Sequence, residues 1–116
     1  MSTARLHVAG DPSLALIVRI FVGATAERWN VAPATRDDLR LAASELFAAA
    51  VEAGQDEPIA FELSATGDGV ELRADDVTTA TPDGLEGWDG RSDLIRALFP
   101  GSEVGEGVRI RVPADG

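Results

Sequence analysis

Three carboxylates recur at intervals of seven residues in residues 35–54, TRDDLRLAASELFAAAVEAG. A helix turns by about 100° per residue, so Asp38, Glu45 and Glu52 fall on one flank of it. The bulkier residues gather on a neighbouring face, which consists of Leu39, Ala43, Leu46, Phe47, Ala50 and Ala53. Ala42 and Ala49 lie between the two. A helix with a small, acidic edge beside an apolar face can cover a sheet while it lines a cleft.

A fourth carboxylate ends a predicted strand. Residues 70–76 alternate so that Asp76, and not Asp75, lies on the apolar side with Val70 and Leu72. An inward-facing carboxylate needs a partner, because burial of an unpaired charge is costly. Two interpretations are open: Asp76 binds a ligand, or it caps the turn that follows the strand.

The sequence around the acidic helix supplies a start and a stop. Pro33 suits the first turn, and Thr35 is a candidate cap. Asp37 and Asp38 would stabilise the positive end of the helix dipole, and Gly54 offers a left-handed stop.

An earlier helix is predicted over residues 12–29, with Asp11 as its cap and Pro12 in its first turn. Its expected buried stripe consists of Leu14, Ile17, Val18, Phe21, Thr25 and Trp29. Leu16, Ile20 and Val22 are also apolar and exceed what one stripe needs. This surplus predicts an interface, which we expect to join two copies of the chain as a homodimer.

The remaining elements predict a two-layer α/β (α+β) sandwich. Its sheet is expected to be mixed, mostly antiparallel, with four or five strands and with three helices on one face. Strands are expected at residues 5–9, 59–64 and 70–76, and a hairpin at residues 102–112. The first strand is an edge strand with His7 in solvent, and the third helix runs from Ser92 or Asp93 to Phe99. One domain, residues 1–116, accounts for the length.

The run LAASELFAAAV resembles the first nucleotide-binding box of the GHKL (Bergerat-fold) ATPases, and within them the anti-sigma-factor serine kinases of bacteria. Ala42, Ser44, Glu45 and Ala50 match the pattern of that box. The resemblance implies that Glu45 stands at the position of the catalytic base, and Ala49 at that of the asparagine that holds magnesium. Alanine has no oxygen ligand for magnesium, so no metal site is expected.

The other boxes of this family are matched in part. The resemblance implies that Asp76 accepts a hydrogen bond from adenine, with Thr78 and Ala80 where the family has glycines. Gly90 and Arg91 fall near the phosphate-binding loop, without the family's Gly-x-Gly. The order strand, helix, helix, strand, strand, lid, helix, hairpin is similar to that of the family over nearly the whole chain.

These features favour a regulatory, protein-binding module of the anti-sigma-kinase-like family: a pseudokinase with a degenerate nucleotide site and no cofactor. The resemblance implies a role in bacterial transcription regulation, with a sigma factor or an anti-anti-sigma protein as partner. The alternative is an active protein serine kinase that uses ATP and magnesium, with Glu45 as its base. A small-molecule binder that has kept the cleft is a third hypothesis.

Composition excludes several other classes of protein. A net charge of −10 opposes nucleic-acid binding, because phosphates would be repelled. The absence of cysteine and the single histidine exclude disulfides, thiolate metal sites and His-rich centres. The most apolar run, residues 14–24, contains Arg19 and is shorter than the ~20 residues of a membrane span. It also lacks the charged leader of a signal peptide, so a cytoplasmic protein without membrane contact is expected.

Overall fold

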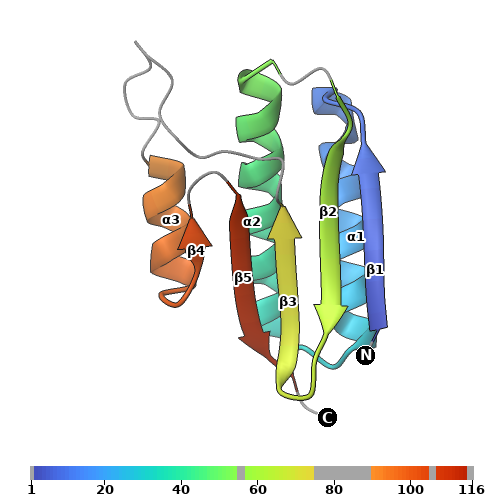
Figure 1. Cartoon of the computed structure of the whole chain (residues 1–116), viewed down its shortest axis with the longest axis vertical. Coiled ribbons are helices and arrows are strands. Elements are labelled where there is room, and N and C mark those ends of the chain that lie inside the picture. Colours follow the sequence, from blue (N-terminus) through green and yellow to red (C-terminus); the bar gives the residue numbers. More distant parts are fainter. Residues whose placement is uncertain (1, 55–56, 75–89, 105–106, 115–116) are drawn as a thin grey trace.

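A five-stranded sheet backed by helices forms the described part of the chain (Figure 1). The computed structural model describes residues 2–54, 57–74, 90–104 and 107–114. The strands follow the order β1-β2-β3-β5-β4, and each described pair is antiparallel. The predicted α+β sandwich is therefore confirmed. The sheet was expected to be mixed and mostly antiparallel, and all of its described strand pairs are antiparallel.

The order of the elements agrees with the sequence prediction wherever the chain is described. The strands are β1 (Ser2–Val8), β2 (Ile59–Ala65), β3 (Gly69–Ala74), β4 (Glu103–Val104) and β5 (Val108–Pro113). The helical elements are a 3-10 turn, η1 (Pro12–Leu14), and the helices α1 (Ala15–Arg28), α2 (Pro33–Glu52) and α3 (Gly90–Leu98).

Alternation along the strands gives the sheet one covered face and one open face. The side chains under the helices are buried, among them Phe61, Leu72 and Ile110. We term the other side the open face; its polar side chains are Thr3, Arg5, His7, Glu62, Ser64, Glu71, Arg73, Glu103, Arg109 and Arg111. His7 is exposed on edge strand β1, as predicted.

The start of the first helical segment follows the prediction. Oδ1 of Asp11 accepts a hydrogen bond from the backbone N–H of Ser13 at 2.9 Å, with Pro12 in the first turn. The same hydrogen bond lowers the pKa of the Asp11 carboxyl group, because it stabilises the ionised form.

The rotation of α1 about its axis differs from the prediction. Val22, expected to be surplus, is fully buried, and Ile17, expected in the buried stripe, is 46% exposed. The reason is that α1 packs against α2 as well as against the sheet, which turns its buried face toward Val18, Val22 and Ala26. Leu16 and Ile20 remain exposed.

The limits of α2 confirm the predicted stop and correct the predicted cap. The helix begins at Pro33, whose fixed φ suits a first turn. It has no side-chain cap, because its N-cap residue, Ala32, carries no hydrogen-bond acceptor. Thr35 lies inside the helix and is not its cap. Asp37 lies beyond the first turn and forms an ion pair with Arg40. Gly54 ends the helix in the left-handed conformation, with φ of 72°.

The third helix begins at Gly90 and ends at Leu98. Its start lies two residues before Ser92, the first of the two predicted caps. A difference of this size is within the fraying of a helix end. α3 contacts α2 and β4. Ile95 and Phe99 are buried there and extend the core beyond the edge of α2.

The hairpin between β2 and β3 closes where predicted and brings β3 against β5. The backbone N–H of Thr66 donates to the carbonyl oxygen of Gly69 at 2.8 Å. Gly69 stands opposite Pro113 of β5. A Cβ atom at Gly69 would lie 2.0 Å from the carbonyl oxygen of Val112, so only glycine fits this approach.

We expect Gly69→Ala to destabilise the protein by about 1–3 kcal/mol, since the backbone of β5 would have to move. This corresponds to a fall in Tm on the order of 5–15 °C in a thermal melt followed by circular dichroism. The matched control is Gly67→Ala in the same turn, where an added Cβ would meet nothing within 4 Å. Equal melting of the two variants would contradict the close approach of β3 and β5.

Candidate functional site

The three predicted carboxylates lie along one flank of α2. Asp38 and Glu45 are half-buried, and Glu52, at the end of the helix, is exposed. Residues seven apart in a helix are separated by about 10 Å along its axis. The three carboxylates therefore occupy separate parts of the flank and cannot share a single bound ion.

The alanines between these carboxylates and the core are not accessible to solvent. Ala42 and Ala49 are both 0% exposed. Ala49 lies one helical turn after Glu45, at the position that the resemblance assigns to the magnesium ligand. This position has no polar side-chain atom and no contact with solvent.

At position 49, α2 offers no side-chain ligand for a magnesium ion. Magnesium requires oxygen ligands in near-octahedral arrangement. Across residues 2–54, 57–74, 90–104 and 107–114, no group of three or more His, Asp or Glu side chains could hold a metal ion. Glu45 is thus a carboxylate on a helix flank whose neighbour at the ligand position, Ala49, is buried and apolar.

The other predicted site residues are only partly described. Asp76, Thr78 and Ala80 lie in residues 75–89, outside the described residues, so their roles stay predictions. Gly90 and Arg91 form the first two residues of α3 in the backbone, but the side chain of Arg91 is outside what the structure describes. The structure does not test whether the five residues come together.

A cluster of charges on the open face was not anticipated from the sequence. Glu71 of β3 lies 2.8 Å from Nε of Arg111, 3.7 Å from that of Arg109 and 3.8 Å from that of Arg73. We term these four residues the arginine cluster. Glu71 raises the pKa of the Arg111 guanidinium by hydrogen bonding and charge attraction.

The signal for this cluster is divided between distant parts of the sequence. The runs Glu71-Leu72-Arg73 and Arg109-Ile110-Arg111 each show alternation, but their partnership depends on how the strands pair. In the sheet, Glu71 stands opposite Arg111, and Arg73 stands opposite Arg109.

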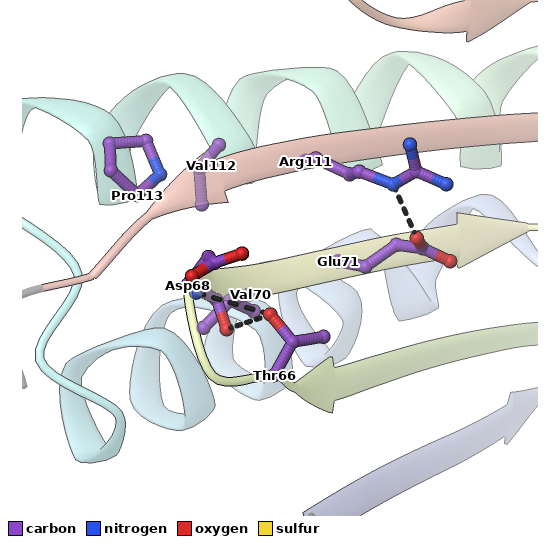
Figure 2. Close-up of a pocket in the computed structure, with 8 residues that line it drawn as sticks. Thr66, Asp68, Val70, Glu71, Arg111, Val112 and Pro113 are labelled. Atoms are coloured by element: carbon purple, nitrogen blue, oxygen red, sulfur yellow. Dashed lines mark hydrogen bonds and ion pairs between the residues drawn. The ribbon is translucent and has the colours of Figure 1, made fainter.

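An open groove of about 630 Å³ lies beside this cluster, at the end of the sheet where β3 begins and β5 ends (Figure 2). Its lining residues are Thr66, Asp68, Gly69, Val70, Glu71, Arg111, Val112 and Pro113. Figure 2 shows Arg111 beside Glu71, and Thr66 bonded within the turn. The lining therefore combines two carboxylates, of Asp68 and Glu71, with one guanidinium, of Arg111. The side chains of Val70 and Val112 are themselves buried on the covered face.

Residues 9–105 match the family model of the histidine kinase-like ATPase domain. The match includes α1, α2, β2, β3 and α3. No curated protein matches the sequence at a significant level. Of the helices in the described residues, none is long and apolar enough to cross a membrane.

We expect Ala49→Asn to lower the free energy of unfolding by about 1–3 kcal/mol, because it buries an amide without a partner. Ala48→Asn, at the half-buried neighbouring position, is the matched control and should cost less than about 1 kcal/mol, from helix propensity alone. Urea unfolding measures both. Equal effects would mean that position 49 opens to solvent, as a working metal site requires.

Proposed function

The chain belongs to the histidine kinase-like ATPase domain family, of the GHKL type, and from this premise we propose that it is a regulatory protein-binding module with a degenerate nucleotide site. It acts as a pseudokinase, with residues 1–116 as one domain and with no bound cofactor. Its fold supplies a rigid surface, and its function is the binding of another protein rather than phosphoryl transfer.

Ala49 is the observation that carries this proposal. Phosphoryl transfer depends on magnesium to neutralise charge on the transferred group. The resemblance puts a magnesium ligand at this position, and here it is a fully buried alanine. The other carboxylates of the flank lie about 10 Å from Glu45 and cannot replace the ligand.

By resemblance to the anti-sigma-factor kinases, the partner is a sigma factor or an anti-anti-sigma protein, and the setting is transcription regulation in the bacterial cytoplasm. The acidic character of the chain, with net charge −10, supports a protein partner rather than nucleic acid.

An active protein serine kinase is the second candidate. It is favoured by Glu45, which keeps the position of the family's catalytic base and is not fully buried. In such an enzyme Glu45 would deprotonate the serine of the partner and Asp76 would bind adenine. Gly90 and Arg91 would contact the phosphates of ATP bound with magnesium.

A thermal melt with magnesium-ATP separates the two candidates. A ligand at a hundredfold excess over its Kd stabilises the native state by about 2.7 kcal/mol, which raises Tm by on the order of 10 °C. We expect no shift with several-millimolar magnesium-ATP, and the same result for Glu45→Ala. A magnesium-dependent rise of several degrees that Glu45→Ala leaves in place would restore nucleotide binding, and loss of phosphoryl transfer in that variant would establish the kinase.

The exposed side of α1 supports self-association as part of this function. Leu16 is 56% and Ile20 is 58% exposed. The two residues are one helical turn apart, so two antiparallel copies of α1 can place Leu16 of each against Ile20 of the other. Such a two-fold contact is isologous, which is the commonest form of homodimer.

We expect light scattering at micromolar concentration to give the mass of two chains, and Leu16→Ser with Ile20→Ser to give that of one. The control is Leu41→Ser, which removes an exposed leucine from α2 instead and should leave the dimer intact. A monomeric wild-type protein would rule out the homodimer without affecting the proposal for the nucleotide site.

A further inference from the structure

Strand β1 forms one edge of the sheet (Figure 1). Its seven residues, Ser2–Val8, pair with β2 in an unbroken register, so no bulge interrupts the strand. The strand at the opposite edge, β4, has only two residues. Proteins usually protect an edge as long as β1 with proline, lysine or a bulge, and β1 has none of these.

Hydrogen bonding in the β2–β3 hairpin shows which backbone groups of β1 are bonded to β2. The N–H of Thr66 donates to the carbonyl oxygen of Gly69 in β3. The backbone groups of Ser64 also face β3, because every second residue of an antiparallel strand bonds to the same neighbour. Leu63, next to Ser64, faces the other way and stands opposite Ala4 of β1. Ala4 and every second residue of β1 from it therefore bond to β2.

The intervening residues of β1 have their backbone groups at the free edge of the sheet. These residues are Thr3, Arg5 and His7, whose N–H and C=O groups point away from β2. Their side chains stand roughly perpendicular to the sheet, on the open face, and leave the edge accessible. A row of backbone donors and acceptors of this kind is the site at which an extended segment adds as a further strand.

The side of α1 that lies toward this edge can be identified from its contact with α2. The helix lies behind β1 and β2 (Figure 1). Gly23 faces α2, since a Cβ atom there would lie 2.8 Å from Cδ of Arg40. Residues of a helix are about 100° apart, so Phe21 lies on the other side of the buried Val22, away from α2. Ile17, one turn before Phe21, lies on that same side.

The apolar layer between α1 and β1 is incompletely covered at the free edge. Leu6 of β1 stands opposite the buried Phe61, on the covered side of the sheet. Leu6 and Phe21 are only partly buried, and Ile17 is 46% exposed. A strand added beside β1 would direct every second side chain to the side of the sheet that α1 covers. Apolar residues at alternate positions would therefore complete this layer.

Charge selects among the proteins that could supply such a strand. Arg5 of β1 pairs with Glu62 at 2.7 Å, so the edge strand brings no net charge to the contact when its histidine is neutral. The whole chain has a net charge of −10. This charge attracts a basic segment and repels an acidic segment or a second copy of the chain.

We propose that an extended, basic segment of a partner protein adds to the sheet at the free edge of β1, with apolar side chains at alternate positions against Leu6, Ile17 and Phe21. The proposal names the partner chemistry of the proposed function, and it rests on that function in one respect, that the chain acts by binding a protein. The edge does not include Glu45, so the magnesium-ATP melt tests a different part of the molecule.

Fluorescence anisotropy with a fluorescein-labelled octapeptide of alternating lysine and valine tests the proposal. We expect the wild-type protein to bind it, and Thr3→Pro with His7→Pro to weaken binding about tenfold or more, because two donors at the edge are lost. The matched control is Thr3→Ala with His7→Ala, which removes the same side chains but keeps both donors. It should bind within about twofold of wild type. Proline is tolerated in an edge strand where its nitrogen faces outward, and circular dichroism checks that both variants fold.

The apolar contact has its own pair of variants. We expect Ile17→Ser to weaken peptide binding about threefold or more, since an apolar contact is replaced by a hydroxyl. Leu16→Ser is the matched control, because Leu16 is 56% exposed but lies about 100° away around the helix. It should leave the affinity within about twofold of wild type.

Amide hydrogen exchange of the wild-type protein, followed by nuclear magnetic resonance, locates the peptide without any variant. Added peptide should slow exchange at Thr3, Arg5 and His7, whose N–H groups gain acceptors. Exchange at Ala4 and Leu6 should change less, because β2 already bonds their N–H groups. This alternating protection distinguishes an added strand from a peptide that binds anywhere else on the surface.

The proposal is overturned if no binding occurs, if β1 gains no alternating protection, or if either variant of a matched pair weakens binding as much as the other. It is also overturned by equal binding of the glutamate–valine octapeptide, or of a peptide with four lysines followed by four valines. Protection of the three edge amides in the free protein, with a dimer that the proline variant dissociates, would assign the edge to a second copy and overturn the proposal. None of these results bears on the magnesium-ATP melt.

Discussion

The packing of α2 against the covered face of the sheet is the interaction on which the other features depend. Leu39, Leu46 and Phe47 are fully or almost fully buried on this side of the helix, and complete burial of such a side chain stabilises by about 1.5–3 kcal/mol. Because these residues must face the sheet, the rotation of α2 is fixed. That rotation places Glu45 on the acidic flank and buries Ala49 completely.

Features set by local periodicity could be predicted from the sequence. The alternation in β2, β3 and β5 identified the covered side of each strand, and the spacing of Asp38, Glu45 and Glu52 identified the flank. The prediction of α1 was wrong at Ile17 and Val22, because α2 as well as the sheet buries this helix. When a helix has apolar residues on most sides, its sequence does not determine which of those sides faces the core.

Features set by strand pairing could not be predicted. Glu71 and Arg111 are 40 residues apart, and their contact depends on the register between β3 and β5. A shift of one residue would place Arg111 on the covered face, so burial of Val70, Leu72 and Ile110 selects the observed register. Burial of the core residues thus brings the arginine cluster together, although no local pattern in the sequence predicts it.

β3 is the element common to both surfaces. Its Val70, Leu72 and Ala74 belong to the buried core under the helices, while Glu71 and Arg73 point to the open face. Asp76, the predicted adenine-binding residue, follows two residues after the end of this strand in the sequence. Successive side chains of a strand point in opposite directions, so one short strand contributes to the arginine cluster on one side and to the core on the other. The residue at position 49 is buried under the helices, on the other side of the sheet from the open face, so it does not form part of that surface.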